Sequence, residues 1–389
     1  MIRTHPFGVY IHIPFCTKRC DYCAFATWTD RFYLADAYVR ACQAEVGSAV
    51  AAGMSPASSV FFGGGTPSLL DPQQLAAILA VVPRQPGAEV TVECNPETVD
   101  GPKLRGYRVA GATRLSFGVQ SMAPHVLAAL GREHDVASVQ QAVSAASAAG
   151  LAGSYSVDLI FGGVGESGSD WAATISAVLA FDPPPAHVSA YGLTVEPGTP
   201  LAADPARHPD PDDQAEKYLM ADELLGAGGL EWYEISNWAR PGAECRHNEL
   251  YWAQGEYRGI GCAAHSHAAG RPDRDRSDAA GPAGPRSGAA GPDGARRWWN
   301  VRTPERYVRL VEAGESPKAA GEELDAATCR IEALQLALRT RRGVPEEALP
   351  GWAEDPVLAT LVEPGAAGRV VLTLRGRLLA NEVALRLEP

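Results

Sequence analysis

This sequence has no excess of positive charge, no long apolar run and no disulfide-forming pattern of cysteines. Its 389 residues contain 34 Lys and Arg against 46 Asp and Glu, which gives a formal net charge of −12. Nucleic-acid-binding proteins normally carry a basic patch or stripe, and none is visible, so we expect no nucleic-acid partner. Met1–Pro6 lacks an apolar signal segment, and no apolar run reaches the roughly 18 residues that span a bilayer. We therefore expect a cytoplasmic protein with no integral membrane segment.

The eight cysteines are unevenly distributed. The cytoplasm keeps thiols reduced, so a disulfide framework is not expected in a chain of this length. Three cysteines lie together in the segment CTKRCDYC, at positions 16, 20 and 23, and such a group points to a metal centre. Isolated cysteines are usually small buried apolar side chains. That is the expectation for the other five, which are Cys42, Cys94, Cys245, Cys262 and Cys329.

Short apolar stretches alternate with helical periodicity six times along the first half of the chain. A long helix is expected over 30–54, and Asp71 with Pro72 forms an N-cap and first-turn pair that opens another helix. Such alternation indicates an α/β fold with a parallel sheet and right-handed crossovers. Because no dinucleotide-binding fingerprint is present, it favours an incomplete (β/α)6 barrel over a doubly wound sheet. The expected strands are 7–13, 59–62, 89–94, 114–119, 154–161 and 187–193.

The second half of the chain is less regular. A helix and a strand within 211–238 are expected to extend the sheet, and helices are expected over 304–313 and 322–340, a strand over 369–374 and a helix or strand over 376–387. Residues 268–296 are rich in Gly, Pro and Ala, so they cannot bury enough surface to offset their ordering entropy. The expected domains are a partial barrel over 1–240, a segment over 241–267 that contains HNELYW, a disordered insertion over 268–296, and a small α-rich C-terminal domain over 297–389.

The clustered cysteines form the pattern C-x3-C-x2-C directly after the first expected strand. Thiolates at this spacing can hold one cubic iron-sulfur cluster, and three ligands for four irons leave one iron open. Zinc is the competing interpretation, because His12 could complete a Cys3His site. His12 lies on the strand rather than in the ligand loop, which favours the cluster.

Polar and glycine motifs follow several of the expected strands. The run from Gly63 to Thr66 comes after the second strand, where glycines let backbone amides approach a small charged ligand. Glu93, Gln120 and Asp158 lie at or near the ends of the third, fourth and fifth strands. Ligand sites of such barrels lie at the carboxyl ends of the strands, so these groups are expected to converge on one opening.

The segment IPFCTKRCDYCAF resembles the signature of the radical S-adenosylmethionine (SAM) proteins, in which three cysteines hold a 4Fe-4S cluster and an aromatic residue precedes the last. The resemblance implies that SAM binds the open iron and that an electron donor serves the cluster. Across nearly the whole chain, the sequence is similar to the oxygen-independent coproporphyrinogen III oxidase-like family. That resemblance implies a set of SAM-binding residues: Tyr10, Tyr22, Gly64, Gly65, Thr66, Glu93, Gln120, Arg132, Asp158 and Gly192.

Two branches of that family differ in function. One oxidatively decarboxylates coproporphyrinogen III in porphyrin biosynthesis, and the other is a group of heme chaperones. The decarboxylases have a further cysteine two positions after the third, where this sequence has Phe25, and a longer arm before the cluster. Both differences favour the chaperone branch. We therefore expect a protein that holds heme and transfers it to an acceptor apoprotein, with decarboxylation as the alternative.

The motif HNELYW also favours the chaperone branch, because it resembles the HNxxYW motif linked to heme binding. The resemblance implies heme-site roles for four residues: His247, Asn248, Tyr251 and Trp252. A neutral imidazole is a common axial ligand of heme iron, and flanking aromatic rings can stack on a porphyrin. Other candidate ligands lie nearby in the sequence, and two arginines are candidates to pair with the heme propionates. The ligand candidates are Cys245, Cys262, His265 and His267, and the arginines are Arg240 and Arg246.

Overall fold

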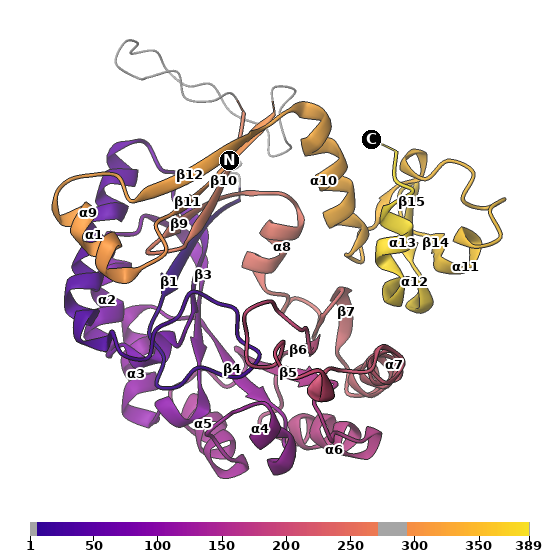
Figure 1. The fold of residues 1–389 in the computed structure, drawn as a ribbon, viewed down its shortest axis with the longest axis horizontal. Coiled ribbons are helices and arrows are strands. Elements are labelled where there is room, and N and C mark those ends of the chain that lie inside the picture. Colours follow the sequence, from indigo (N-terminus) through magenta and orange to yellow (C-terminus); the bar gives the residue numbers. More distant parts are fainter. Residues whose placement is uncertain (1–5, 271–293, 389) are drawn as a thin grey trace.

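The computed structural model describes residues 6–270 and 294–388 of the chain. Its central feature is a 12-stranded sheet in which the first six strands lie side by side in sequence order and pair in parallel. The sheet curves into a partial barrel (Figure 1), which confirms the expected α/β fold and its six parallel strands. These strands are β1 (Phe7–Ile13), β2 (Ala57–Gly64), β3 (Arg84–Cys94), β4 (Arg114–Gln120), β5 (Tyr155–Phe161) and β6 (His187–Gly192).

Helices follow the strands and cover the outer side of the barrel (Figure 1). The central strands are buried on both faces, as parallel sheets require, and in β4 (RLSFGVQ) every residue except Gly118 is buried. Asp71 begins the second helix by accepting a hydrogen bond from the Gln74 amide at 2.8 Å, while its own amide donates to the Gln74 side chain at 3.0 Å. The helices are α1 (Ala35–Ala51), α2 (Pro72–Val81), α3 (Gly101–Ala110), α4 (Pro124–Ala129), α5 (Val136–Ala148), α6 (Gly168–Leu179) and α7 (Pro211–Ala227).

The sheet is extended at both edges. On one side, β8 (Asn237–Ala239) and β7 (Glu231–Glu234) follow α7 and continue the sheet with antiparallel pairing. This agrees with the helix and strand expected within 211–238. On the other side, β9 (Glu256–Ile260) pairs in parallel with β1, and three antiparallel strands follow, which the sequence did not predict. These are β10 (His265–Ala269), β11 (Ala295–Asn300) and β12 (Lys318–Leu324).

The expected helix over 322–340 begins later than predicted. Residues up to Leu324 pair with β11, where Arg297 binds Glu322 at 2.9 Å, and α10 (Ala326–Leu338) starts only after the N-cap Asp325. The Glu-rich end of β12 has a high helix propensity, but its pairing with β11 makes it a strand. Residues 271–293 of the expected insertion lie outside the described residues, while its two ends belong to β10 and β11.

The C-terminal part of the chain forms a second, smaller core. It contains buried side chains from Leu338 to Leu387 and a three-stranded sheet ordered β13–β15–β14. Because β11, α9 (Pro304–Glu312) and β12 belong to the large-sheet side of the molecule, only the later part of the expected 297–389 domain builds this core. Its elements are β13 (Val344–Pro345), α11 (Leu358–Leu361), β14 (Val362–Pro364), β15 (Arg369–Leu372), α12 (Leu374–Leu378) and α13 (Ala380–Ala384).

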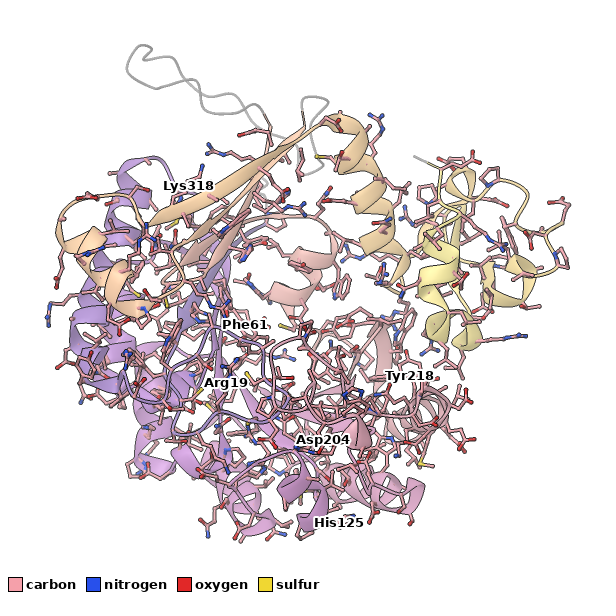
Figure 2. The ribbon with its side chains drawn as sticks, in the orientation of Figure 1. Arg19, Phe61, His125, Asp204, Tyr218 and Lys318 are labelled. Atoms are coloured by element: carbon pink, nitrogen blue, oxygen red, sulfur yellow. The ribbon has the colours of Figure 1, made fainter. Side chains whose placement is uncertain are left out.

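Helix α8 (Arg246–Trp252) packs against β1 and β2. Arg19, in the loop after β1, and Phe61, on β2, lie near the middle of the molecule in Figure 2. In the same view, His125 lies at the outer edge on α4 and Lys318 lies on β12 at the opposite end. The central region therefore combines the cysteine loop, the strand ends and α8.

Candidate functional site

The three clustered cysteines lie in one loop between β1 and α1. Backbone hydrogen bonds pin the loop at both ends, since the amide of Cys16 donates to the Trp28 carbonyl at 3.1 Å and the amide of Trp28 donates to the Pro14 carbonyl at 2.8 Å. All three thiols are free and partly exposed, and they line one cavity. Such a loop presents three sulfurs to one space, which is what a 4Fe-4S cluster with an open iron needs.

Two glycines after β2 bring the backbone close to the cysteine loop. A Cβ at Gly65 would lie 2.6 Å from the Phe15 carbonyl oxygen and 3.1 Å from the Cys16 sulfur, so no larger residue fits. Gly64 has φ of +114°, and a Cβ there would lie 2.4 Å from the His12 ring. Contact with the cysteine loop therefore requires glycine at position 65, and the left-handed φ with the approach of His12 on β1 requires it at position 64.

The cavity lined by the cysteines has a volume of about 600 Å³ and gathers nearly all of the residues expected at the SAM site. Tyr10 is the exception, because its ring lines a neighbouring cavity instead. Gln120, at the end of β4, has a left-handed φ of 64°, a strained conformation that is common in binding sites. The expected residues that line the cysteine cavity are Tyr22, Gly64, Gly65, Thr66, Glu93, Gln120, Arg132, Asp158 and Gly192.

Two acidic side chains of this cavity, Glu93 and Asp158, are held by specific donors. The Gly64 amide donates to Glu93 at 3.2 Å, and burial together with the nearby Asp158 raises the pKa of Glu93 to about 8. Asp158 accepts hydrogen bonds from Ser116 at 2.8 Å and Ser189 at 2.7 Å, and burial raises its pKa. Buried carboxyl groups favour a cationic or hydrogen-bond-donating ligand, since a positive partner offsets their desolvation.

Arg132 is fixed beside the cysteine loop by three acceptors. Its guanidinium donates to the Asn95 side chain and to the Gly118 carbonyl, both at 3.1 Å, and to the Cys20 sulfur at 3.4 Å. A cation at this distance stabilises a thiolate. Asn95 was not predicted, although it follows Glu93 by two positions at the same strand end.

His12 does not complete a zinc site with the cysteines. Its Nε2 donates to the Ala26 carbonyl at 2.9 Å, so its Nδ1 accepts from the Tyr10 hydroxyl at 3.2 Å. Both ring nitrogens are thus engaged, and burial lowers the pKa of His12 to about 4. Across residues 6–270 and 294–388, no three His, Cys, Asp or Glu side chains converge as a mononuclear metal site requires.

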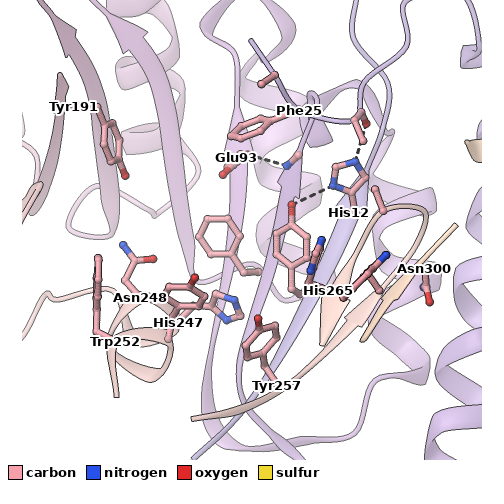
Figure 3. A pocket seen from close by; sticks show the side chains of 18 of the residues that line it. His12, Phe25, Glu93, Tyr191, His247, Asn248, Trp252, Tyr257, His265 and Asn300 are labelled. Atoms are coloured by element: carbon pink, nitrogen blue, oxygen red, sulfur yellow. Dashed lines mark hydrogen bonds between the residues drawn. The ribbon is translucent and has the colours of Figure 1, made fainter. Parts of the chain in front are cut away.

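A second cavity, of about 840 Å³, lies between α8, β1, β2 and the extended edge of the sheet. Figure 3 shows aromatic and imidazole rings from several elements pointing into it. Close packing of α8 on β1 builds one wall, because Gly8 leaves only 2.9 Å between its ideal Cβ position and the Leu250 side chain. Aromatic and histidine residues of the lining are Tyr10, His12, Phe25, Phe61, Tyr191, His247, Tyr251, Trp252, Tyr257, His265 and Trp299.

His247 is oriented by the residues beneath it. Its Nδ1 lies 3.2 Å from the Ser59 hydroxyl, and its ring stacks on Phe61 with centroids 5.2 Å apart. Its Nε2 makes no hydrogen bond within the described part of the chain. Burial lowers the pKa of His247 to about 4, so the imidazole is neutral near pH 7 and can act as a metal ligand.

The other residues expected around the heme divide into two groups. Asn248, Tyr251, Trp252 and His265 line the second cavity with His247. The remaining candidates do not line it: Cys245 faces the cysteine cavity, and Cys262, His267, Arg240 and Arg246 are absent from the second lining. The two arginines instead donate to backbone carbonyls, Arg240 to Gly228 at 3.5 Å and Arg246 to Gly87 at 2.8 Å, so the structure gives neither a place at this cavity.

The two cavities share a wall. Phe25, Phe61, Glu93, Tyr191 and Asn248 line both of them. Phe25 lies directly after the cysteine loop and exposes 63% of its surface, which is unusual for a large apolar side chain. A ligand in the second cavity would therefore lie next to the site of the cysteines. Sequence patterns missed Phe61 and Tyr191, because an aromatic residue on an expected strand is ordinarily part of the core.

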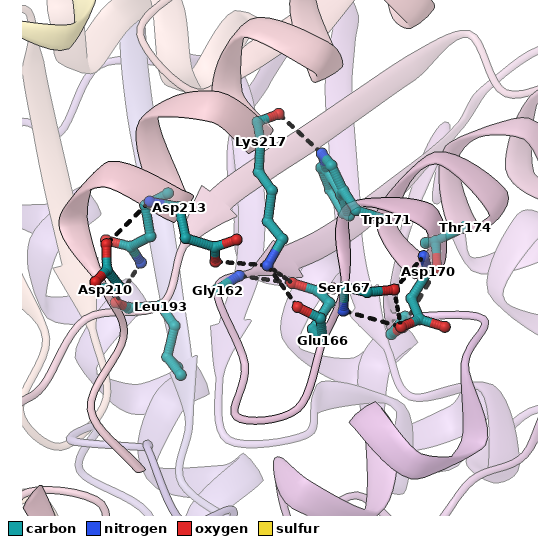
Figure 4. A network of polar contacts seen from close by, with 12 residues as sticks. Gly162, Glu166, Ser167, Asp170, Trp171, Thr174, Leu193, Asp210, Asp213 and Lys217 are labelled. Atoms are coloured by element: carbon teal, nitrogen blue, oxygen red, sulfur yellow. Dashed lines mark hydrogen bonds and ion pairs between the residues drawn. The ribbon is translucent and has the colours of Figure 1, made fainter. Parts of the chain in front are cut away.

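A buried lysine braces the loop at the carboxyl end of β5. Lys217, on α7, is 1% exposed and donates to the Glu166 carbonyl at 2.8 Å and to Asp213 at 2.6 Å, with the Glu166 carboxylate 3.4 Å away (Figure 4). Glu166 in turn accepts from the Gly162 amide at 2.7 Å. The Trp171 indole donates to the Lys217 carbonyl at 2.9 Å. This network joins α6, α7 and the loop after β5.

We expect Lys217→Met to destabilise the protein by about 3 kcal/mol, because removing one partner leaves the buried Glu166 carboxylate without a compensating charge. Urea unfolding followed by circular dichroism would measure the shift in midpoint. Lys318→Met, on the exposed strand β12, is the matched control and should leave the midpoint unchanged. An unchanged midpoint for Lys217→Met would show that the network contributes no net stability.

Within the described residues, no helix combines the length and apolar character needed to cross a membrane. The profile of the Radical SAM superfamily matches residues 10–178. The protein named heme chaperone HemW from Mycobacterium tuberculosis (strain ATCC 25618 / H37Rv) is 39% identical, over 97% of this chain and 94% of its own. The protein of the same name from Bacillus subtilis (strain 168) is 31% identical, over 97% of each chain.

Among solved structures, the fold is similar to that of coproporphyrinogen III oxidase (HemN) from Escherichia coli, described as a radical SAM enzyme. The TM-score is 0.77 over 98% of this chain and 89% of that chain, and the sequence identity is 20%. This likeness concerns the fold, including the C-terminal part. The sequence relatives cover the same extent of the chain at higher identity.

Proposed function

Because the chain belongs to the HemW family of radical SAM proteins, we propose that it is a heme chaperone, which binds heme in the second cavity and passes it to an acceptor apoprotein. The observation that carries this proposal is the cavity of about 840 Å³ beside the cysteines, walled by aromatic rings and containing a neutral imidazole. Large apolar cavities with a few placed polar groups are typical of cofactor sites.

The family implies a 4Fe-4S cluster and SAM, and the residues of the cysteine cavity fit both. Cys16, Cys20 and Cys23 would hold the cluster, and the glycine turn after β2 leaves room beside it. When bound, the cluster supplies one-electron chemistry toward SAM. The protein's own part is to hold the thiolates beside Arg132 and to present Glu93 to the ligand.

His247 would ligate the heme iron through Nε2, because Nδ1 faces Ser59 and the ring is neutral. Aromatic rings of α8 and the sheet would cover the porphyrin faces. His265 lines the same cavity and stacks on Trp299 at 5.5 Å, so it is the competing ligand. We further propose a cytoplasmic location, where thiols stay reduced, and a reduced electron-carrier protein as the donor.

The decisive experiment tests one anaerobically reconstituted preparation of the protein with hemin and, separately, with coproporphyrinogen III. We expect hemin to bind and then to transfer to an apoprotein acceptor, while coproporphyrinogen III, with SAM and a reductant, keeps its mass. Absorbance titration and mass spectrometry make the two measurements, and a known coproporphyrinogen oxidase run in parallel is the control. Release of carbon dioxide from coproporphyrinogen III would contradict the chaperone proposal and show that Phe25 is compatible with decarboxylation.

A further inference from the structure

The charges that line the second cavity are unevenly placed. Its carboxyl groups are buried: burial and the nearby Asp158 raise the pKa of Glu93 to about 8, and burial raises that of Glu234 to about 7. In the described part of the lining, Arg302 is the one arginine or lysine, and it is exposed to solvent. The cavity therefore has a permanent cation at its rim.

Arg302 has a free side chain on a fixed backbone. Directly before it, the Val301 amide donates to the Pro317 carbonyl at 2.8 Å, and the Val301 carbonyl accepts from the Ala263 amide at 2.9 Å. One residue earlier, the buried Asn300 side chain donates to Glu45 and to the Gly261 carbonyl, both at 2.8 Å. The Arg302 guanidinium itself makes no hydrogen bond or ion pair with any residue that the structure describes.

Two arginines on the extended edge of the sheet are paired with carboxylates. Arg297 pairs with Glu322 at 2.9 Å, and Arg258 lies 3.6 Å from Glu45. In a chain with a formal net charge of −12, carboxylates are plentiful, yet none in the described part of the chain pairs with Arg302. An unpaired guanidinium beside a cavity is suited to a planar anion, because its donors match the two oxygens of a carboxylate.

We propose that Arg302 binds a propionate carboxylate of the heme and so sets the orientation of the porphyrin in the cavity. The inference rests on the proposed heme-binding function and adds to it a residue that recognises the anionic edge of the ligand. The propionates then face the solvent-exposed rim, while the iron lies over His247 deeper in the cavity. Arg302 takes the role that the sequence suggested for Arg240 and Arg246.

The test compares hemin, iron-free protoporphyrin IX and hemin dimethyl ester, which lacks free carboxylates. We expect Arg302→Gln to weaken binding of hemin and of protoporphyrin IX about fivefold, the scale of an exposed ion pair, and to leave the ester unaffected. Arg302→Lys should recover part of the loss. Arg306→Gln is the control, because Arg306 is exposed on α9 (Pro304–Glu312) and does not line the cavity.

The outcomes separate this inference from the function on which it rests. Equal affinities of Arg302→Gln and the unaltered protein for hemin would overturn the role of Arg302 and leave heme binding intact. Equal weakening for hemin and its ester would also overturn it, because the effect would not depend on a carboxylate. Failure of the unaltered protein to bind hemin would overturn the proposed function itself.

Discussion

Replacing Cys20 with Ser is expected to abolish the iron-sulfur cluster completely. A cubic cluster in this loop has only Cys16, Cys20 and Cys23 as thiolate ligands, so one lost sulfur leaves two irons without a protein ligand. Serine keeps the size of the side chain and removes the soft ligand. Anaerobic reconstitution followed by iron and sulfide analysis and visible absorbance would measure the loss.

Cys329→Ser is the matched control for this experiment. Cys329 is 1% exposed and lies on α10, far along the chain from the cysteine loop, and it does not line either cavity. We expect this variant to bind as much iron and sulfide as the unaltered protein. A full cluster in Cys20→Ser, with both variants folded by circular dichroism, would remove Cys20 from the ligand set.

The partial barrel was predictable because its pattern is local. Each parallel strand is a short apolar run followed by helical periodicity, and caps such as Asp71 lie within a few residues of the helices they begin. The extension from β9 to β12 was not predictable in the same way. Strand β9 pairs with β1 across most of the chain, and β12 contains helix-forming residues that become a strand only by pairing with β11.

The candidate site likewise has one part that could be predicted from the sequence and one part that could not. The cysteine loop and the strand-end residues could be predicted, since the carboxyl ends of neighbouring parallel strands meet at one edge. The second cavity depends on β9 pairing with β1 and on β10 and β11 continuing the sheet beyond β9, so its wall could not be inferred from spacing. The family resemblance implied that Tyr10 binds SAM, whereas its side chain lines the second cavity and hydrogen-bonds to His12, and spacing gave no indication of Arg302.

Replacing His247 with Ala is expected to weaken hemin binding roughly a hundredfold, because loss of even a group that only orients a metal ligand costs about 10- to 100-fold. Within HNELYW, the imidazole offers the nitrogen suited to bind iron, since Ser59 engages its Nδ1 and Nε2 has no partner among the described residues. The cluster should be unaffected, because His247 does not line the cysteine cavity. Absorbance titration with hemin, alongside iron and sulfide analysis, measures both effects.

His265→Ala is the sharpest comparison for this variant, because His265 lines the same cavity and stacks on Trp299 rather than on Phe61. We expect it to keep the heme spectrum, and we expect added imidazole to restore the spectrum of His247→Ala by filling the space left beside Phe61. The opposite pattern, with the spectrum lost only in His265→Ala, would make His265 the iron ligand. Because both histidines line the second cavity, that result would change which histidine binds the iron and would still place the heme in this cavity.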